Sequence, residues 1–448
     1  MRRSLGPLGA VLLVLMVLLV ACAPVATPTA GPTKAAPPPT SAALAPTPTA
    51  AAPAAKPTEP AKAAAGPIKI GFLTPLVGVF AALGADLRDG FLLYLDEKGN
   101  TVAGRKVEVI VEDDEQKPDV GLTKAKKLVE RDGVHMLGGI ISSGVALSVG
   151  PYATAQKKVL LLMNAGADEL TQQRADPFIF RNSFANSMNG MPAGDWAYKQ
   201  KGWRTAVILG SDYAAGWETV GGFARTFTDL GGRIVQEIYP PLGNPDPAPF
   251  VTQIKQADVT FVFQAGADTA RFVPAYTEYG VKARQPLAGG FGLADITMLP
   301  SMGDAAVGIF QSGPYFEDLD TEANRAFRKK FQDKFGRVAT LNSEASYTAA
   351  RMVARALETI NGNIENTDAF IEAMRKVEVP DAPRGPVKFD KYQNVVGPFR
   401  VSEVQKKDGK LVHIAVAEYP NMSQFYKWSP EEWLKMPPLS EMKGKWVK

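Results

Sequence analysis

The sequence has almost no cysteine or histidine, and this scarcity excludes several kinds of chemistry. Cys22 is the only cysteine among 448 residues, and His135 and His413 are the only histidines. Disulfides and thiol catalysis are therefore excluded from the chain after residue 22. The chain also lacks a Gly-x-Ser-x-Gly elbow, a His-Glu-x-x-His pattern and a Gly-x-Gly-x-x-Gly after its first predicted strand. We therefore expect no enzyme and no cofactor.

A metal site is not expected either. The acidic run Asp113-Asp114-Glu115 is the cluster that most suggests a cation. It ends a predicted strand, so we interpret it as a solvated turn.

A charge imbalance is missing as well. The formal net charge is +4, and the basic excess falls before residue 67, so the rest of the chain carries basic and acidic side chains in equal number. A domain without net positive charge does not attract the phosphate backbone of DNA or RNA, so we expect no nucleic-acid partner.

A hydrophobic run of spanning length is absent, because the run from Leu8 to Ala21 is shorter than the roughly 20 residues needed to cross a bilayer. It follows Met1-Arg2-Arg3 and stops at Cys22, which is typical of a secretory signal. Leu19-Val20-Ala21-Cys22 resembles the bacterial lipobox, whose cysteine becomes the diacylglycerated N-terminus; the alternative is a buried cysteine in an anchor helix. We expect residues 1–22 to be a lipoprotein signal peptide, and the chain to be exported and lipid-anchored to the cell membrane through Cys22, facing the periplasm or the exterior.

Residues 23–66 are rich in Ala, Pro and Thr and contain no aromatic side chain. Such a composition cannot bury enough apolar surface to offset the entropy of ordering, so we predict a disordered tether.

Residues 67–448 exceed the size at which one core stops growing, so two domains or lobes are expected. Short apolar runs alternate with amphipathic stretches from Ile68 to Leu162, and the alternation begins again at Thr205 and continues to Ala288. Such alternation is typical of an α/β fold with parallel sheets. Long helices are predicted over 321–335 and 347–360, a short helix over 250–256, and antiparallel strands over 387–389, 397–404 and 411–415.

Several stretches, taken in order, resemble the branched-chain amino-acid type (Leu/Ile/Val-binding family) of periplasmic solute-binding protein, the receptor of an ABC transporter. The resemblance covers nearly all of residues 67–416 and rests on an ordered set of short motifs: Gly71–Gly78, Gly84–Gly90, Gly138–Gly144, Ala165–Thr171, Phe180–Asn182, Asp212–Gly216 and Gly385–Asp390. It implies a periplasmic binding protein type I fold: two Rossmann-like lobes, joined by a multi-strand hinge, that close on a ligand.

The resemblance also implies how the chain is divided. Lobe 1 would comprise residues 67–185 and about 315–384, and lobe 2 residues 186–314 and about 385–416. Residues 417–448 would form a C-terminal extension.

Candidate ligand-binding residues follow predicted strands, where loops of open α/β sheets expose backbone amides. Ser142, Ser143 and Gly144 could hold a carboxylate; the alternative is an ordinary serine N-cap. Ala165, Gly166 and Ala167 allow close backbone approach, or form a simple tight turn. Tyr213 could cover the ligand, or pack on the surface.

Two positions depart from the family pattern. Ala215 stands where the family often has a second aromatic residue. Phe291 stands where amino-acid binders supply a carboxylate to the ligand's ammonium, and an unpartnered buried ammonium is costly. Either the ligand lacks an α-amino group, or Asp268, two residues after Gly266, replaces that carboxylate; the alternative for Asp268 is a helix N-cap.

We therefore expect a monomeric solute-binding lipoprotein of an ABC importer, whose partners are the membrane permease and a small ligand. The ligand would be an amino acid or a related hydrophobic or aromatic carboxylate. The alternatives are a ligand sensor for a membrane signalling partner and a secreted hydrolase.

Overall fold

The computed structural model describes residues 66–447, which lie within one compact unit. Cys22, the predicted signal peptide and all of the predicted tether except Gly66 lie outside the described residues. Within residues 66–447, no helix is both long and apolar enough to cross a membrane.

The first lobe contains a six-stranded sheet in the order β2-β3-β1-β4-β5-β6. All neighbouring strands are parallel except β2, which pairs antiparallel with β3. Parallel strands covered on both faces read as nearly continuous apolar runs, as in Val159–Leu162, where all four residues are buried. The strands are β1 (Ile68–Thr74), β2 (Thr101–Val102), β3 (Arg105–Asp113), β4 (Met136–Gly139), β5 (Val159–Leu162) and β6 (Ile179–Arg181).

The second lobe contains a nine-stranded sheet in the order β12-β13-β14-β11-β10-β9-β7-β8, with β15 paired to β14. Strands β7 to β11 are parallel, whereas β14 and β15 run antiparallel to their neighbours. The strands are β7 (Thr205–Gly210), β8 (Arg233–Ile238), β9 (Val259–Phe263), β10 (Leu287–Gly290), β11 (Phe310–Gly313), β12 (Glu378–Val379), β13 (Val387–Phe389), β14 (Val395–Lys407) and β15 (Lys410–Met422). The predicted fold class, two α/β lobes with parallel sheets, is confirmed.

Helices connect most of the parallel strands, because the chain must cross back before it can pair in the same direction. The helices that follow strands of the first sheet are α1 (Ala81–Glu97), α2 (Pro118–Lys126) and α3 (Ser143–Ala155). Those of the second lobe are α4 (Met191–Lys199), α5 (Ala214–Asp229), α6 (Ala248–Thr252), α7 (Ala267–Glu278), α8 (Val281–Arg284) and α9 (Leu299–Met302).

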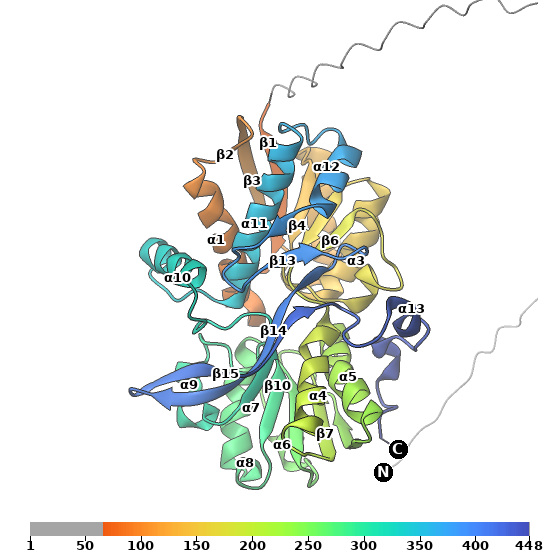
Figure 1. The fold of residues 1–448 in the computed structure, drawn as a ribbon, viewed down its shortest axis with the longest axis vertical. Helices are drawn as coiled ribbons and strands as arrows, with labels where there is room; N and C mark the ends of the chain where they lie inside the picture. The colour runs from red at the N-terminus through yellow and green to blue at the C-terminus, as the bar shows by residue number, and fades with distance from the viewer. Residues whose placement is uncertain (1–65, 448) are drawn as a thin grey trace, which may run out of the picture. The chain divides into compact units, whose positions relative to one another are not determined.

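After β11 the chain returns to the first lobe through α10 (Glu322–Phe335), α11 (Leu341–Thr359) and α12 (Thr367–Arg375) (Figure 1). α11 packs closely along α1, because Gly90 has no side chain: a Cβ there would collide with the backbone oxygen of Ser343. The chain therefore passes between the lobes after β6, after β11 and again after α12, where β12 and β13 extend the second sheet to the first lobe and Phe389 packs on Phe180. These three crossings form the hinge.

Four local expectations differ from the structure. α11 begins at Leu341 rather than Tyr347, because Thr340 caps it and its hydroxyl accepts a hydrogen bond from Ser343 N. α6 ends at Thr252, before the predicted end. β15 continues to Met422, so the expected start of the C-terminal extension at 417 falls inside a strand. Asp114 is fully buried rather than solvated, because its carboxylate closes the turn after β3 by accepting from Gln116 N.

The chain after β15, residues 423–447, is here called the C-terminal segment. It includes α13 (Pro430–Trp433), and Figure 1 shows it in dark blue beside α5. Trp433 is 1% exposed, and its indole N–H donates to Gln172 in the first lobe. Arg225 on α5 donates to the Pro437 carbonyl. The C-terminal segment therefore contacts both lobes.

Candidate functional site

A small cavity lies where loops from the two lobes meet, beyond the carboxyl ends of the parallel strands. It encloses about 30 Å³. Ligands of open α/β sheets bind at this edge, so the location fits a binding site. The first lobe contributes Phe80, Leu83, Ile141, Ser143, Asn164 and Gly166, and the crossing after β6 contributes Phe184 and Asn186. The second lobe contributes Tyr213, Ala215, Phe263, Ala265 and Phe291.

Of the three residues predicted after β4, Ser143 lines the cavity. Its hydroxyl oxygen accepts a hydrogen bond from Asn186 Nδ2 at 3.1 Å. Ser142 occupies the N-cap position of α3, but its side chain forms no capping hydrogen bond, so the ordinary serine cap is wrong. Gly144 lies beside Pro118 instead of the cavity: a Cβ there would be 3.4 Å from Pro118 Cγ.

The predicted loop after β5 reaches the cavity through Gly166, whose carbonyl accepts from Asn186 N at 2.7 Å. A Cβ at Gly166 would collide with the Asn186 side chain, so this close approach requires glycine. Ala165 and Ala167 are fully buried behind the loop and do not line the cavity. Asn164 does line it, and its amide donates to Asn342 Oδ1 at 2.5 Å.

The two aromatic residues predicted in the second lobe both line the cavity. Tyr213 precedes α5, and its ring centroid lies 6.4 Å from that of Phe263. Phe291 follows β10 and packs across the cavity against Phe184, with 5.8 Å between ring centroids. These ring contacts close the cavity with apolar surface.

Gly266 and Asp268 do not line the cavity. Gly266, with φ of 61°, precedes α7, and a Cβ there would collide with the Val79 carbonyl. Asp268 is the second residue of α7, so its interpretation as an N-cap is wrong. Its carboxylate accepts from Gly243 N at 2.8 Å and pairs with Arg271. Burial raises the pKa of this carboxyl above its usual value.

Sequence reasoning missed most of the apolar wall, including Phe80 and Ile141. It also missed Asn186, although the stretch 182–189 was recognisable as a polar crossover between the two βα arrays. Nothing in the local sequence marks these residues, because the tertiary fold alone brings their loops together.

The lining side chains share one electrostatic property. Among them is no Asp, Glu, Lys or Arg, and the polar groups are Ser143, Asn164, Asn186 and Tyr213. The cavity therefore offers aromatic surface and neutral hydrogen-bonding groups to a ligand.

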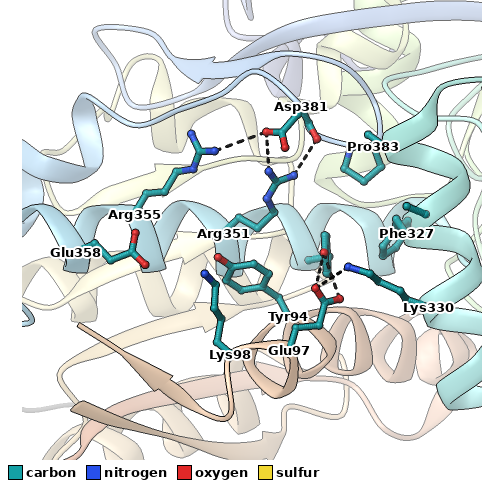
Figure 2. Close-up of a pocket in the computed structure, with 13 residues that line it drawn as sticks. Tyr94, Glu97, Lys98, Phe327, Lys330, Arg351, Arg355, Glu358, Asp381 and Pro383 are labelled. Atoms are coloured by element: carbon teal, nitrogen blue, oxygen red, sulfur yellow. Dashed lines mark hydrogen bonds and ion pairs between the residues drawn. The ribbon is translucent and has the colours of Figure 1, made fainter. Parts of the chain in front are cut away.

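A wider groove of about 510 Å³ lies on the first lobe, between α1, α10 and α11 (Figure 2). Its charged side chains are largely paired with one another. Arg351 binds the exposed Asp381 at 2.6 Å, and Lys330 pairs with Glu97 at 2.8 Å. The groove also touches only one lobe, so hinge motion would not enclose a ligand there.

Comparison with known proteins agrees with this geometry. The periplasmic binding protein family model matches residues 67–410. The Leu/Ile/Val-binding protein homolog 6 of Brucella melitensis is 29% identical over 355 residues, which cover 77% of this chain and 90% of that protein.

Two solved structures are similar over nearly their whole length. An ABC transporter substrate-binding protein from Sphaerobacter thermophilus is 35% identical, with a TM-score of 0.75, covering 79% of this chain and 98% of that one. A solute-binding protein of an ABC transporter from Rhodopseudomonas palustris BisB5, in complex with 3,4-dihydroxybenzoic acid, is 32% identical, with a TM-score of 0.76 and coverage of 80% and 98%. These relatives are solute-binding proteins rather than enzymes.

The family model matches most of the chain, and two lobes surround a shared cavity. Members of this family work outside the cytoplasm. The chain therefore belongs to the periplasmic binding protein family, of the branched-chain amino-acid type.

Proposed function

We propose that this protein is the solute-binding component of an ABC importer and that it captures a small aromatic carboxylate between its two lobes. The observation that carries the proposal is the lining of the cavity, which combines five aromatic rings with no charged side chain. Aromatic surface with a few convergent polar groups is the usual composition of a small-molecule site. The Rhodopseudomonas palustris relative in complex with 3,4-dihydroxybenzoic acid supports this ligand class.

The carboxylate end would lie against Ser143, at the start of α3. The hydroxyl of Ser143 is in the cavity, and the backbone N–H groups of the first turn of a helix are free to bind an anion. Asn164 also lines the cavity, and its amide nitrogen has a second hydrogen besides the one donated to Asn342, while Asn186 orients the Ser143 hydroxyl by donating to it. Neutral donors and the helix dipole would thus hold the negative charge without a cationic side chain.

An α-ammonium group finds no comparable partner. No carboxylate lines the cavity, and that of Asp268 is already engaged by Gly243 and Arg271. Burying an unpaired ammonium costs several kcal/mol, which favours a carboxylate without an α-amino group over an amino acid. An amino acid remains the second candidate because of the Leu/Ile/Val-binding relative.

The lobes must separate for a ligand to enter. The cavity of about 30 Å³ holds no more than one or two water molecules, so a benzene ring requires movement of the loops around it. The hinge of three crossings supplies this movement without unfolding either lobe.

Export and anchoring are part of the proposal. Acylation of Cys22 would hold the protein at the membrane, and tethering raises the effective concentration of a receptor near its permease. Mass spectrometry of the mature protein is expected to find an acylated N-terminal Cys22. An unprocessed Met1 would contradict the anchor and leave the ligand proposal intact.

Calorimetry with matched ligand pairs tests the ligand class. Benzoate and 4-hydroxybenzoate should bind, and 4-methylpentanoate should bind more tightly than leucine, which has the same skeleton plus an ammonium. Tighter binding of leucine or phenylalanine than of the matched acids would overturn the aromatic carboxylate in favour of an amino acid.

A further inference from the structure

A hydrogen-bonded cluster connects the cavity to α5, and the side-chain amide of Asn186 is its central group. Asn186 Nδ2 donates to Ser143 Oγ at 3.1 Å and to Glu218 Oε2 at 2.7 Å. The same Glu218 oxygen accepts from Asp168 N at 3.1 Å. Asp168 Oδ1 in turn accepts from Ser187 N at 3.1 Å. Glu218 itself does not line the cavity, but it is two hydrogen bonds from Ser143.

The members of the cluster come from both lobes. Ser143 begins α3 after β4 of the first sheet, and Asp168 begins a short 3-10 helix after β5. Residues 186–190 pack so closely on α5 that a Cβ at Gly190 or at Gly222 would collide with backbone atoms of the other segment. Asn186 therefore moves with Glu218 as part of the second lobe, and the cluster lies across the contact between the lobes.

Neither carboxyl of the cluster has a cationic partner at ion-pair distance among residues 66–447. Glu218 is 2% exposed and Asp168 is 4% exposed, and Asp168 Oδ2 has no hydrogen-bond partner. Arg181 lies nearby, but its guanidinium donates to Ala167 O, Thr171 and Asn394. Arg225 and Tyr213 also lie near the two carboxyls, and Asp390 lies near Arg181.

Burial is the main cause that raises the pKa of Glu218 well above its usual value, and the neighbouring Asp168 adds to the effect. Burial likewise raises the pKa of Asp168. The Arg181 charge lowers both pKa values, but burial outweighs it because Arg181 forms no ion pair with either carboxyl. Two adjacent buried carboxylates cannot both ionise without a large cost, so the pair retains a proton at a pH where exposed carboxyls have lost theirs.

We propose that Glu218 is a positioning residue which carries a proton when the lobes are in contact, so that the protein captures its anionic solute together with a proton. The inference rests on the proposed function, because it requires an anion bound at Ser143. A protonated Glu218 is neutral and does not repel that anion. Protonated Glu218 still accepts the hydrogen bond that orients Asn186 toward Ser143. Ionised Glu218 would place a second negative charge beside the bound carboxylate.

Closure and anion binding both favour the protonated carboxyl, so the complex binds more protons than the open protein. Affinity is then highest near the usual carboxyl range, around 4.5, and falls as the pH rises through the raised value.

The experiment measures the dissociation constant of benzoate by calorimetry between pH 5 and pH 8.5. For the unmodified protein we expect affinity to fall with rising pH, by up to about tenfold per pH unit where one proton is linked to binding. Glu218→Gln keeps an acceptor for Asn186 and cannot ionise, so its profile should be flat. Glu358→Gln on the exposed side of α11 removes an equal charge and should reproduce the profile of the unmodified protein.

Parallel profiles for the unmodified protein and Glu218→Gln would overturn the inference and leave the ligand class standing. A separate readout uses no ligand: chemical unfolding across the same pH range. A raised carboxyl pKa makes the unmodified protein lose stability relative to Glu218→Gln as the pH rises above about 4.5. Failure of benzoate to bind would then contradict the proposed function alone, whereas a constant difference in stability would contradict the inference.

Discussion

At the scale of single residues, small and neutral side chains form the polar part of the cavity lining. Ser143 begins α3, Gly166 lets a loop approach Asn186, and Asn186 bonds to both lobes. These side chains are small, so substituting one of them leaves the hydrophobic core in place.

Ser143→Ala should weaken benzoate binding by about tenfold, because a hydrogen bond to a charged group contributes roughly 1.5 kcal/mol or more. Calorimetry measures the change. Ser148→Ala, on the same helix and outside the cavity, is the matched control and should bind as the unmodified protein does. Equal affinity of both variants would remove Ser143 from the site.

Phe291→Ala should weaken benzoate binding by tenfold or more, since it removes one of the rings that pack around the cavity. Phe316 is also buried, at 3% exposure, but it packs on His413 and does not line the cavity. Phe316→Ala should therefore lower stability while the folded protein keeps its affinity. Binding titrations paired with thermal unfolding separate the two effects.

At the scale of elements, a buried ion pair ties α11 to the hinge. Arg384 is 1% exposed and donates to Glu344 Oε2 at 2.5 Å, and it also donates to the carbonyls of Asn182 and Ser183 in the first crossing. The pair therefore connects two of the three segments that pass between the lobes. α11 itself begins six residues earlier than its apolar stripe indicates, because Thr340 caps it.

Arg384→Met should lower the free energy of unfolding by about 3–5 kcal/mol, because it leaves the Glu344 carboxylate buried without a cation. Urea denaturation measures the loss. Adding Glu344→Gln to the same chain should recover part of it, since the second change removes the unpaired charge. Arg355→Met, at a more exposed position on α11, should cost less than about 1 kcal/mol.

At the scale of the described molecule, the C-terminal segment links the lobes on the side of α5. Leu439 packs against Gly221, and Trp446 N donates to Glu237 Oε1 at 2.7 Å. Trp433 contacts the first lobe through Gln172, while the Arg225 guanidinium lies 4.8 Å from its ring centroid. Contacts with both lobes therefore hold the C-terminal segment in one position.

Trp433→Ala should destabilise the protein by about 3–5 kcal/mol, as expected for removal of a large buried ring. Urea denaturation again measures the effect. Trp428 is only partly buried, so Trp428→Ala should cost less. Equal losses of unfolding free energy in the two variants would show that the contact of Trp433 with Gln172 adds no stability of its own.

Hinge motion predicts a change in size. Small-angle scattering should show a smaller radius of gyration when benzoate is added, because ligand contacts on both lobes favour the closed arrangement. An unchanged radius at saturating benzoate would show that the lobes do not move on binding.

The sequence by itself determined the fold class, because strand and helix periodicity repeats along the chain in two arrays and reflects local burial. It also placed Ser143, Gly166, Tyr213 and Phe291 after strands, where the topology brings loops together. It missed β11, whose residues Phe-Gln-Ser-Gly carry little apolar signal and are buried only by neighbouring strands.

Only the tertiary structure decided which loops meet. It turned Asp268 toward Gly243 and Arg271, and so left the cavity without a carboxylate. It brought Phe80 and Asn186 to the cavity, and it buried Glu218 and Asp168 beside each other. The physical reason is that charge pairing and desolvation depend on distances between residues far apart in the chain, which periodicity does not encode.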